Sequence, residues 1–169
     1  MKKKRKSQAE ITQMKKVSAL KNLYYNRYLM VRYFLAVFLF SNFYWALYTN
    51  GTWSMIIPLA LLVMAIPPCI ENIQCYGEKA TAMNWTKRYY KAQMCVNIGL
   101  LLLGTTPLFK EIMPFLSDTI TSRIIACGIY FIGFLMALSC HNRLRKIDTN
   151  SDKQYARIHQ YEKAVKLHL

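Results

Sequence analysis

An apolar segment near the amino terminus, residues 29–48, reads LMVRYFLAVFLFSNFYWALY. Its only charged residue is Arg32, close to its start. A helix of roughly 20 apolar residues crosses the hydrocarbon core of a bilayer, which is about 30 Å thick. A long basic stretch precedes the segment and no small-residue cleavage site follows it. We therefore expect a membrane span rather than a cleaved signal peptide, and a mature chain that starts at Met1.

Three further apolar segments follow the first one. They cover residues 53–70, 92–109 and 122–140, and each is about as long as a bilayer-spanning helix. The alternating pattern of membrane strands is absent, and a helix satisfies its own backbone hydrogen bonds in lipid. The sequence therefore predicts an all-α integral membrane protein with a bundle of four transmembrane helices over residues 29–140.

The composition agrees with a membrane protein and excludes two other classes. Of the 169 residues, 54% are hydrophobic, which is too apolar for a disordered chain. There are 23 Lys+Arg against 8 Asp+Glu, a formal charge of +15. The basic residues lie between and beyond the apolar segments rather than on one soluble face, so we expect no nucleic-acid partner.

The distribution of basic residues predicts the orientation of the chain. Ten lie in residues 1–32, four in 71–91 and seven in 141–169, against only Lys110 and Arg123 in the other connections. Short loops rich in Lys and Arg stay in the cytoplasm, so both termini are expected there, in a cell membrane. Aromatic residues favour the interfaces, and we place Trp45, Tyr48 and Trp53 at the outer one.

The amino-terminal region, residues 1–28, has the pattern of a basic amphipathic helix. Ser7 and Glu10 form a capping box, in which each side chain accepts a hydrogen bond from a backbone N–H of the first turn. Apolar residues then recur at helical spacing beside several lysines. We expect this helix to run without interruption into the first span.

Two more amphipathic helices are predicted on the cytoplasmic side. One lies in the middle loop, after a break at Gly77, and includes Trp85 and Tyr89. The other lies in the tail, residues 141–169, after a break at 148–150, and a second capping box is formed by Ser151 and Gln154. These basic helices either lie on the anionic inner leaflet or pack together, or against a protein partner or a second copy, as a docking platform.

Uncharged polar residues inside the predicted spans are candidates for contacts between helices. Asn42 and Asn97 are expected to hydrogen-bond neighbouring helices. Arg32 and Glu71 lie at similar depths near the inner boundary, where they either pair or Arg32 extends to the headgroups. No ionisable residue lies at the bilayer midplane, where proton-coupled transporters need one.

Two local patterns predict backbone features of the bundle. Pro67 and Pro68 are expected to kink the second span or to free backbone carbonyls there. Gly133 and Ala137, four residues apart, favour close approach of the third and fourth spans.

No motif in the sequence indicates catalysis, and we expect no catalytic, cofactor-binding or metal-binding residues. A thiol- or histidine-dependent enzyme would draw on Cys140, His141 and His159, but adjacent residues on a helix do not face each other. The nucleotide-binding and hydrolase motifs are absent. The leading hypothesis is a non-enzymatic accessory or regulatory subunit of a membrane complex. The alternatives are a small oligomeric transporter or channel, and a membrane enzyme.

Overall fold

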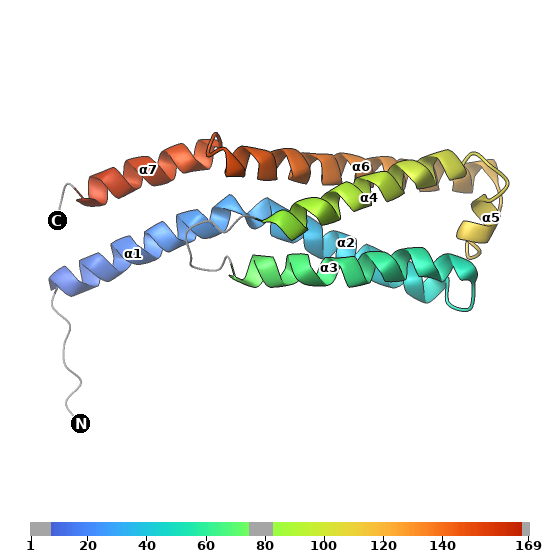
Figure 1. Ribbon diagram of the computed structural model, residues 1–169, viewed down its shortest axis with the longest axis horizontal. Coiled ribbons are helices and arrows are strands. Elements are labelled where there is room, and N and C mark those ends of the chain that lie inside the picture. Colours follow the sequence, from blue (N-terminus) through green and yellow to red (C-terminus); the bar gives the residue numbers. More distant parts are fainter. Residues whose placement is uncertain (1–7, 75–82, 167–169) are drawn as a thin grey trace, which may run out of the picture.

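The computed structural model describes residues 8–74 and 83–166, with the side chains of residues 9, 10 and 164–166 excepted. All the regular elements in these ranges are helices, and they form an elongated bundle (Figure 1). The elements follow in the order α1 Gln8–Arg27, α2 Leu29–Tyr48, η1 Trp53–Met55, α3 Ile56–Gln74, α4 Asn84–Leu103, α5 Phe109–Ile112, α6 Ile120–Asp148 and α7 Lys153–Lys166.

Four long helices, α2, α3, α4 and α6, run alongside one another and form the body of the molecule (Figure 1). Helix α4 packs against both α3 and α6, and α2 packs against α3. Helices α1 and α7 continue beyond one end of this bundle and lie side by side there (Figure 1). We call the α1–α7 pair the stalk, and we call the opposite end of the bundle the α5 end.

Three segments of the described chain are long and apolar enough to cross a membrane. They are Leu29–Tyr48, which is α2, Trp53–Gln74, which is η1 with α3, and Ile120–Lys163, which contains α6 and most of α7. A multi-pass membrane protein that contacts the lipid bilayer is therefore supported by length and composition. Their many exposed apolar side chains, such as Ile73 at 73% and Ile124 at 67%, agree with this placement, since a lipid-facing helix surface needs no covering.

The helix predicted in the middle loop is not a separate element but the beginning of α4. Residues from Asn84 onward form a single helix that includes the segment predicted as a span. Its buried side chains are Thr86, Tyr89, Tyr90, Gln93, Asn97 and Leu100. These residues form one continuous stripe at helical spacing. Lys91 does not interrupt the stripe, because its side chain lies on the opposite, exposed face of α4.

Helix boundaries also differ from the sequence-based expectations. Helices α1 and α2 are separated at Tyr28, where the backbone leaves helical geometry for one residue (φ −101°, ψ 1°). Helix α4 ends at Leu103 rather than Phe109, because a turn containing two threonines and Pro107 follows it. Helix α6 extends to Asp148, so residues 141–148 belong to it rather than to the tail helix.

The start of α7 is capped by Asp152 rather than Ser151. An Asp152 carboxylate oxygen accepts from the backbone N–H of Tyr155 at 3.2 Å, the bond expected of an N-cap residue. Ser151 instead contacts the Thr149 hydroxyl at 2.8 Å, which places it in the turn. Asn150 in this turn has a positive φ of 52°, which makes the predicted break sharp. The Ser7 capping box and the break at Gly77 lie outside the described residues and side chains.

Candidate functional site

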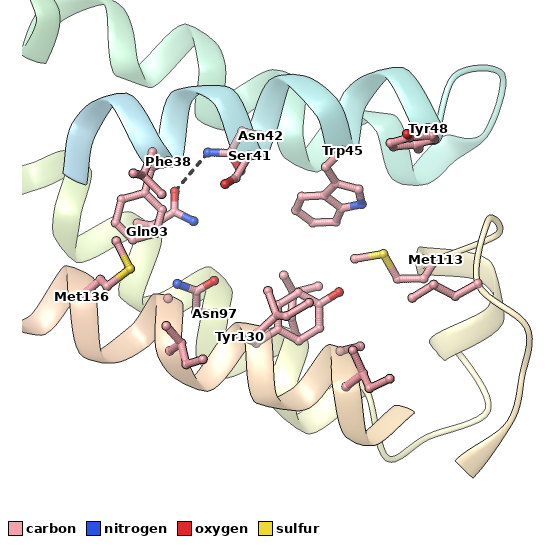
Figure 2. A pocket seen from close by; sticks show the side chains of 18 of the residues that line it. Phe38, Ser41, Asn42, Trp45, Tyr48, Gln93, Asn97, Met113, Tyr130 and Met136 are labelled. Carbon is pink, nitrogen blue, oxygen red and sulfur yellow. Dashed lines mark hydrogen bonds between the residues drawn. The ribbon is translucent and has the colours of Figure 1, made fainter. Parts of the chain in front are cut away.

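A cavity of about 450 Å³ lies between α2, α4 and α6. Its buried floor includes Phe38 and Asn42 from α2, Gln93 and Asn97 from α4, and Ala126 from α6. Figure 2 shows these helices surrounding the space, with the α5 segment beside it. The lining is mostly apolar with a few polar groups, which is the usual composition of a small-molecule site.

Two of the amide side chains in the cavity form a hydrogen bond with each other across two helices. The Asn42 side-chain nitrogen donates to the Gln93 side-chain oxygen at 3.2 Å (Figure 2). The same nitrogen lies 3.4 Å from the Tyr89 hydroxyl. All three side chains are at least 95% buried. The contact therefore ties α2 to α4 at one edge of the cavity, in the manner of polar residues in membrane bundles.

Two other cavity donors have no hydrogen-bond partner. They are the side-chain nitrogen of Asn97, which is 5% exposed, and the indole N–H of Trp45, which is 9% exposed. Both side chains point into the space between the helices (Figure 2). An unpaired buried donor costs about 1–3 kcal/mol, so each such group needs a physical explanation.

Trp45 is buried, unlike the other two aromatic residues that were expected at the outer interface. Tyr48 and Trp53 are well exposed, at 64% and 57%, as residues at an interface are. Trp45 is one helical turn away from Tyr48 and faces inward, where it packs with Leu100, Phe109 and Ala126. The sequence pattern of aromatics near a helix end does not distinguish these two positions.

The α5 end of the cavity is lined by aromatic and apolar side chains. The rings of Tyr48 and Phe115 lie 5.2 Å apart and join the end of α2 to the segment after α5. Arg123 at the start of α6 donates to the carbonyls of Gly104 and Thr106, at 3.3 and 2.9 Å, and also binds Asp118. These contacts fix the connection between α4 and α6.

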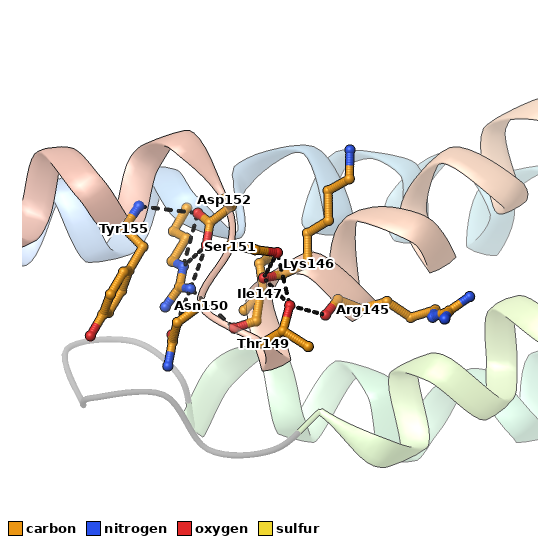
Figure 3. A network of polar contacts seen from close by, with 9 residues as sticks. Arg145, Lys146, Ile147, Thr149, Asn150, Ser151, Asp152 and Tyr155 are labelled. Atoms are coloured by element: carbon orange, nitrogen blue, oxygen red, sulfur yellow. Dashed lines mark hydrogen bonds and ion pairs between the residues drawn. The ribbon is translucent and has the colours of Figure 1, made fainter.

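The stalk contains a buried ion pair that links sequence-distant residues. Arg27, at the end of α1, is 1% exposed, and its Nε lies 3.1 Å from each carboxylate oxygen of Asp152. Its Nη2 donates to the Ile147 carbonyl at 3.1 Å and to the Asn150 side chain at 3.0 Å. Figure 3 shows how closely these acceptors gather around the α6–α7 turn. One guanidinium thus binds the end of α6, the turn and the start of α7.

A second polar contact lies farther along the stalk. The Tyr24 hydroxyl donates to a Glu162 carboxylate oxygen at 2.9 Å. Burial raises the pKa of Tyr24 to about 12, and the hydrogen bond to Glu162 adds to this effect. Because the pKa in the packed stalk lies above the ordinary value of about 10, the neutral phenol stabilises α1–α7 packing.

We expect this packing to weaken at high pH. The contribution of Tyr24 is complete below about pH 10 and is lost as the pH rises toward 12. Tyrosinate absorbance at 295 nm, taken as the difference between the wild type and Tyr24→Phe, should show one titration near 12. The Asp152→Ala variant, which removes the ion pair, should return it toward about 10. A difference titration near 10 in the wild type would contradict the contact.

Arg32 and Glu71 have different partners in the structure. Arg32 Nη2 donates to the Asn72 carbonyl at 3.2 Å, and its guanidinium lies 4.3 Å from the centre of the Tyr25 ring. Glu71 accepts from the backbone N–H groups of Trp85 and Thr86, at 2.9 and 2.8 Å, and from the Thr86 hydroxyl. Glu71 therefore caps α4 from the neighbouring helix, since the residue at the cap position, Met83, has no side-chain acceptor.

Removing this cap should destabilise the bundle. We expect Glu71→Ala to lower the free energy of unfolding by about 1 kcal/mol, the ordinary value of an N-cap. Unfolding in mixed micelles of increasing SDS content measures the change. Glu111→Ala is the matched control, because Glu111 is an exposed acid in α5. Equal effects of the two substitutions would contradict a capping role for Glu71.

The structure locates the two predicted backbone features, the proline pair in α3 and the small residues Gly133 and Ala137 in α6. Helix α3 continues through Pro67 and Pro68 to Gln74, and the Asn72 side chain donates to the Pro68 carbonyl at 2.8 Å. On α6, a Cβ added at Gly133 would lie 3.0 Å from the Asn97 side-chain nitrogen. Ala137, one turn further on, is fully buried. Gly133 thus borders the cavity beside Asn97.

The candidate residues for thiol or histidine chemistry do not form a cluster. Cys140 is 0% exposed and packs in the apolar core, while His159 is exposed on α7. Among the described residues, no group of three or more His, Cys, Asp or Glu side chains is placed to hold a metal ion. Cys75 lies outside the described part of the chain.

Several residues of these sites were not identified from the sequence. The sequence patterns do not single out Arg27, Gln93 or Asp152. One signal was present: acids are rare in this chain, so an acid next to a predicted helix break is a candidate partner for a distant cation. None of the protein-family models, curated proteins or solved structures compared with the chain matches it.

Proposed function

We propose that this protein is a non-enzymatic accessory or regulatory subunit of a membrane complex, and that its stalk docks an acidic protein partner in the cytoplasm. In this proposal the chain crosses the membrane four times with both termini in the cytoplasm. The observation that carries the docking role is the buried Arg27–Asp152 pair, which holds α1 and α7 together as one structural unit.

The case for a fourth span comes from the position of α4. This helix has 20 residues and is therefore about 30 Å long, and it packs between two candidate spans, α3 and α6. Its cations, Lys87, Arg88 and Lys91, all lie in its first two turns, at the stalk end. Lys87 pairs with Asp148 there. A helix so placed crosses with its neighbours and keeps its basic end on the cytoplasmic side.

The shape of the stalk favours docking over a position flat on the leaflet. Helix α1 carries on from α2, and α7 from α6, along the long axis of the bundle (Figure 1). If α2 and α6 span the bilayer, the stalk projects away from its surface. Helices that lie in the interface turn a whole apolar face to the lipid, whereas α1 and α7 pack against each other. Among the described residues, Met14 and Val17 are the large apolar side chains that this pair leaves exposed.

The charge of the stalk indicates the chemistry of the partner. Its exposed cations are Lys15, Lys21, Lys153, Arg157 and Lys163. The acids with described side chains are used within the stalk, since Asp152 binds Arg27 and Glu162 binds Tyr24. The stalk therefore presents a positive surface, which attracts and orients an acidic protein surface.

Site-specific photo-crosslinking in native membranes tests this proposal. A photoreactive amino acid is placed at Val17 of α1, which is 53% exposed, and the control position is Ile124 of α6, which is 67% exposed. We expect a protein adduct at Val17 and none at Ile124. The adduct should be lost in a Lys15→Glu, Lys21→Glu variant and retained in Lys110→Glu, an exposed cation at the α5 end.

Other outcomes of this experiment would overturn the proposal. An adduct only between copies of this chain would identify a homo-oligomer instead. Adducts only with lipid would place the stalk on the leaflet. A protein adduct that persists in the Lys15→Glu, Lys21→Glu variant would contradict an acidic partner.

A transporter or channel is the second candidate function, and the cavity among α2, α4 and α6 is the observation that favours it. This candidate predicts substrate-dependent flux in proteoliposomes, with loss of flux when Gly133→Leu fills the cavity. The accessory role predicts no flux. The enzyme alternative has less support, because the thiol of Cys140 is fully buried.

A further inference from the structure

The cavity between α2, α4 and α6 has two unpaired donors at different depths. Trp45 lies three residues, about 4.5 Å of helix rise, before the end of α2 at Tyr48. Asn97 lies six residues, about 9 Å, before the end of α4 at Leu103. Both donors therefore face the space below the level of the headgroups, where the surrounding medium is hydrocarbon if α2 and α6 span the bilayer.

Water does not explain the cavity well. Its volume of about 450 Å³ is many times the roughly 30 Å³ that one water occupies in the liquid. Most of its lining is apolar, and apolar cavities remain dry. The volume lies within the roughly 300–1,000 Å³ of small-molecule sites.

Part of the cavity rim lies between two candidate spans, α2 and α6. This part consists of exposed residues on the facing edges of these spans: Val37 on α2, and Ile125, Ile129 and Ile132 on α6, each 47–62% exposed. The Tyr48–Phe115 ring pair lies at the α5 end of the cavity. A molecule dissolved in the hydrocarbon core therefore has a route of entry between α2 and α6, if these helices span the bilayer.

The chemistry of the donors selects the ligand. The indole N–H of Trp45 is donor only, and the free nitrogen of Asn97 is also a donor, so both require acceptor oxygens. A phospholipid keeps its ester carbonyls near the headgroup level, above Asn97. No cation faces the cavity among its lining residues, which disfavours an anionic ligand.

We propose that this cavity binds an uncharged, membrane-soluble carbonyl compound of the quinone type, whose oxygens accept hydrogen bonds from Trp45 and Asn97. The inference rests on the bilayer placement of α2 and α6 in the proposed function, and not on a partner for the stalk. Its failure would therefore leave the crosslinking result at Val17 unaffected.

Tryptophan fluorescence in liposomes provides the test, since Trp45 lies in the site. With Trp53 and Trp85 replaced by phenylalanine, the emission of Trp45 is followed while decylubiquinone is added. We expect saturable quenching, because a quinone that contacts the indole quenches it. An excess of decylbenzene, which has a similar apolar body and no carbonyl, should not reverse the quenching.

Two variants in the same background locate the site. Asn97→Leu removes the amide at nearly constant volume, and we expect the apparent Kd to rise about five- to tenfold, the usual effect of one hydrogen bond. Gly133→Ala adds a methyl group 3.0 Å from the Asn97 nitrogen and should weaken binding as well. Gly128→Ala on the same helix meets nothing within 4 Å and is the matched control.

Three results would overturn the proposal. Quenching that rises linearly with quinone, as for a tryptophan ester dissolved in the same liposomes, would show partition without a site. Displacement by decylbenzene would show an apolar groove in which the donors have no role. Equal affinity of wild type and Asn97→Leu, with unchanged helicity by circular dichroism, would remove the amide from the site.

Discussion

Substitution of Asp152 by alanine should release α7 from α1 while the bundle stays folded. The change leaves the Arg27 guanidinium buried at 1% exposure without its carboxylate, and it removes the N-cap of α7. Loss of one partner of a buried ion pair costs about 3–5 kcal/mol. The stalk absorbs this cost because α7 has its main packing partner in α1, whereas the bundle helices pack among themselves.

Limited trypsin digestion in detergent micelles measures the release. Helix α7 contains exposed sites at Lys153, Arg157 and Lys163, which are cut when the helix opens locally. We expect cleavage in α7 to accelerate about a hundredfold or more, given the cost of about 3 kcal/mol or above. Cleavage at Lys110, at the far end of the molecule, should not change and provides the internal reference.

Two control variants separate the ion pair from the cap. Asp152→Asn keeps a good N-cap oxygen and removes the charge, so it should lie between wild type and alanine. Asp148→Ala removes a partly exposed acid that binds Lys87, and it should have little effect. If Asp148→Ala and Asp152→Ala accelerate cleavage equally, the buried pair does not hold the stalk together.

The sequence predicted those parts of the fold that follow from hydrophobic length and periodicity. The first predicted segment, 29–48, coincides with α2, and the break at 148–150 separates α6 from α7. Both signals are local, since a span needs only its own apolar residues and a turn only its own backbone. The prediction over 92–109 was less accurate, because Lys87, Arg88 and Lys91 interrupt the apolar pattern at the start of α4 while its buried stripe continues past them.

The candidate sites depend on contacts that no local pattern contains. Arg27 and Asp152 are separated by 125 positions, and only the packing of α1 on α7 brings them together. The inward direction of Trp45 depends on which face of α2 meets α6. Asn42 and Asn97 were recognised as polar groups in a membrane, but their different states, one paired and one unpaired, required the position of Gln93.

Substitution of Ala137 by leucine should disrupt the packing of α4 on α6. Ala137 is 0% exposed and lies in a core cluster with Tyr90, Cys140 and Leu144. Helices in lipid associate mainly through van der Waals packing, and small residues allow their backbones to approach closely. Three additional carbon atoms at this position have no space, so the helices must separate or the side chains must leave their preferred rotamers.

We expect Ala137→Leu to lower the free energy of unfolding by about 1–3 kcal/mol, the usual cost of overpacking a core. Unfolding in SDS-containing mixed micelles gives the value. Ala60→Leu is the matched control, since Ala60 is an exposed alanine in the second turn of α3 and the added carbons point away from the bundle there. Ala137→Ser should remain close to wild type, because it changes polarity with little change of volume. The opposite result would be a large loss of unfolding free energy with serine and a small loss with leucine. It would indicate that polarity, rather than size, limits this position. Close packing of α4 on α6 would then not be the reason for a small residue at Ala137.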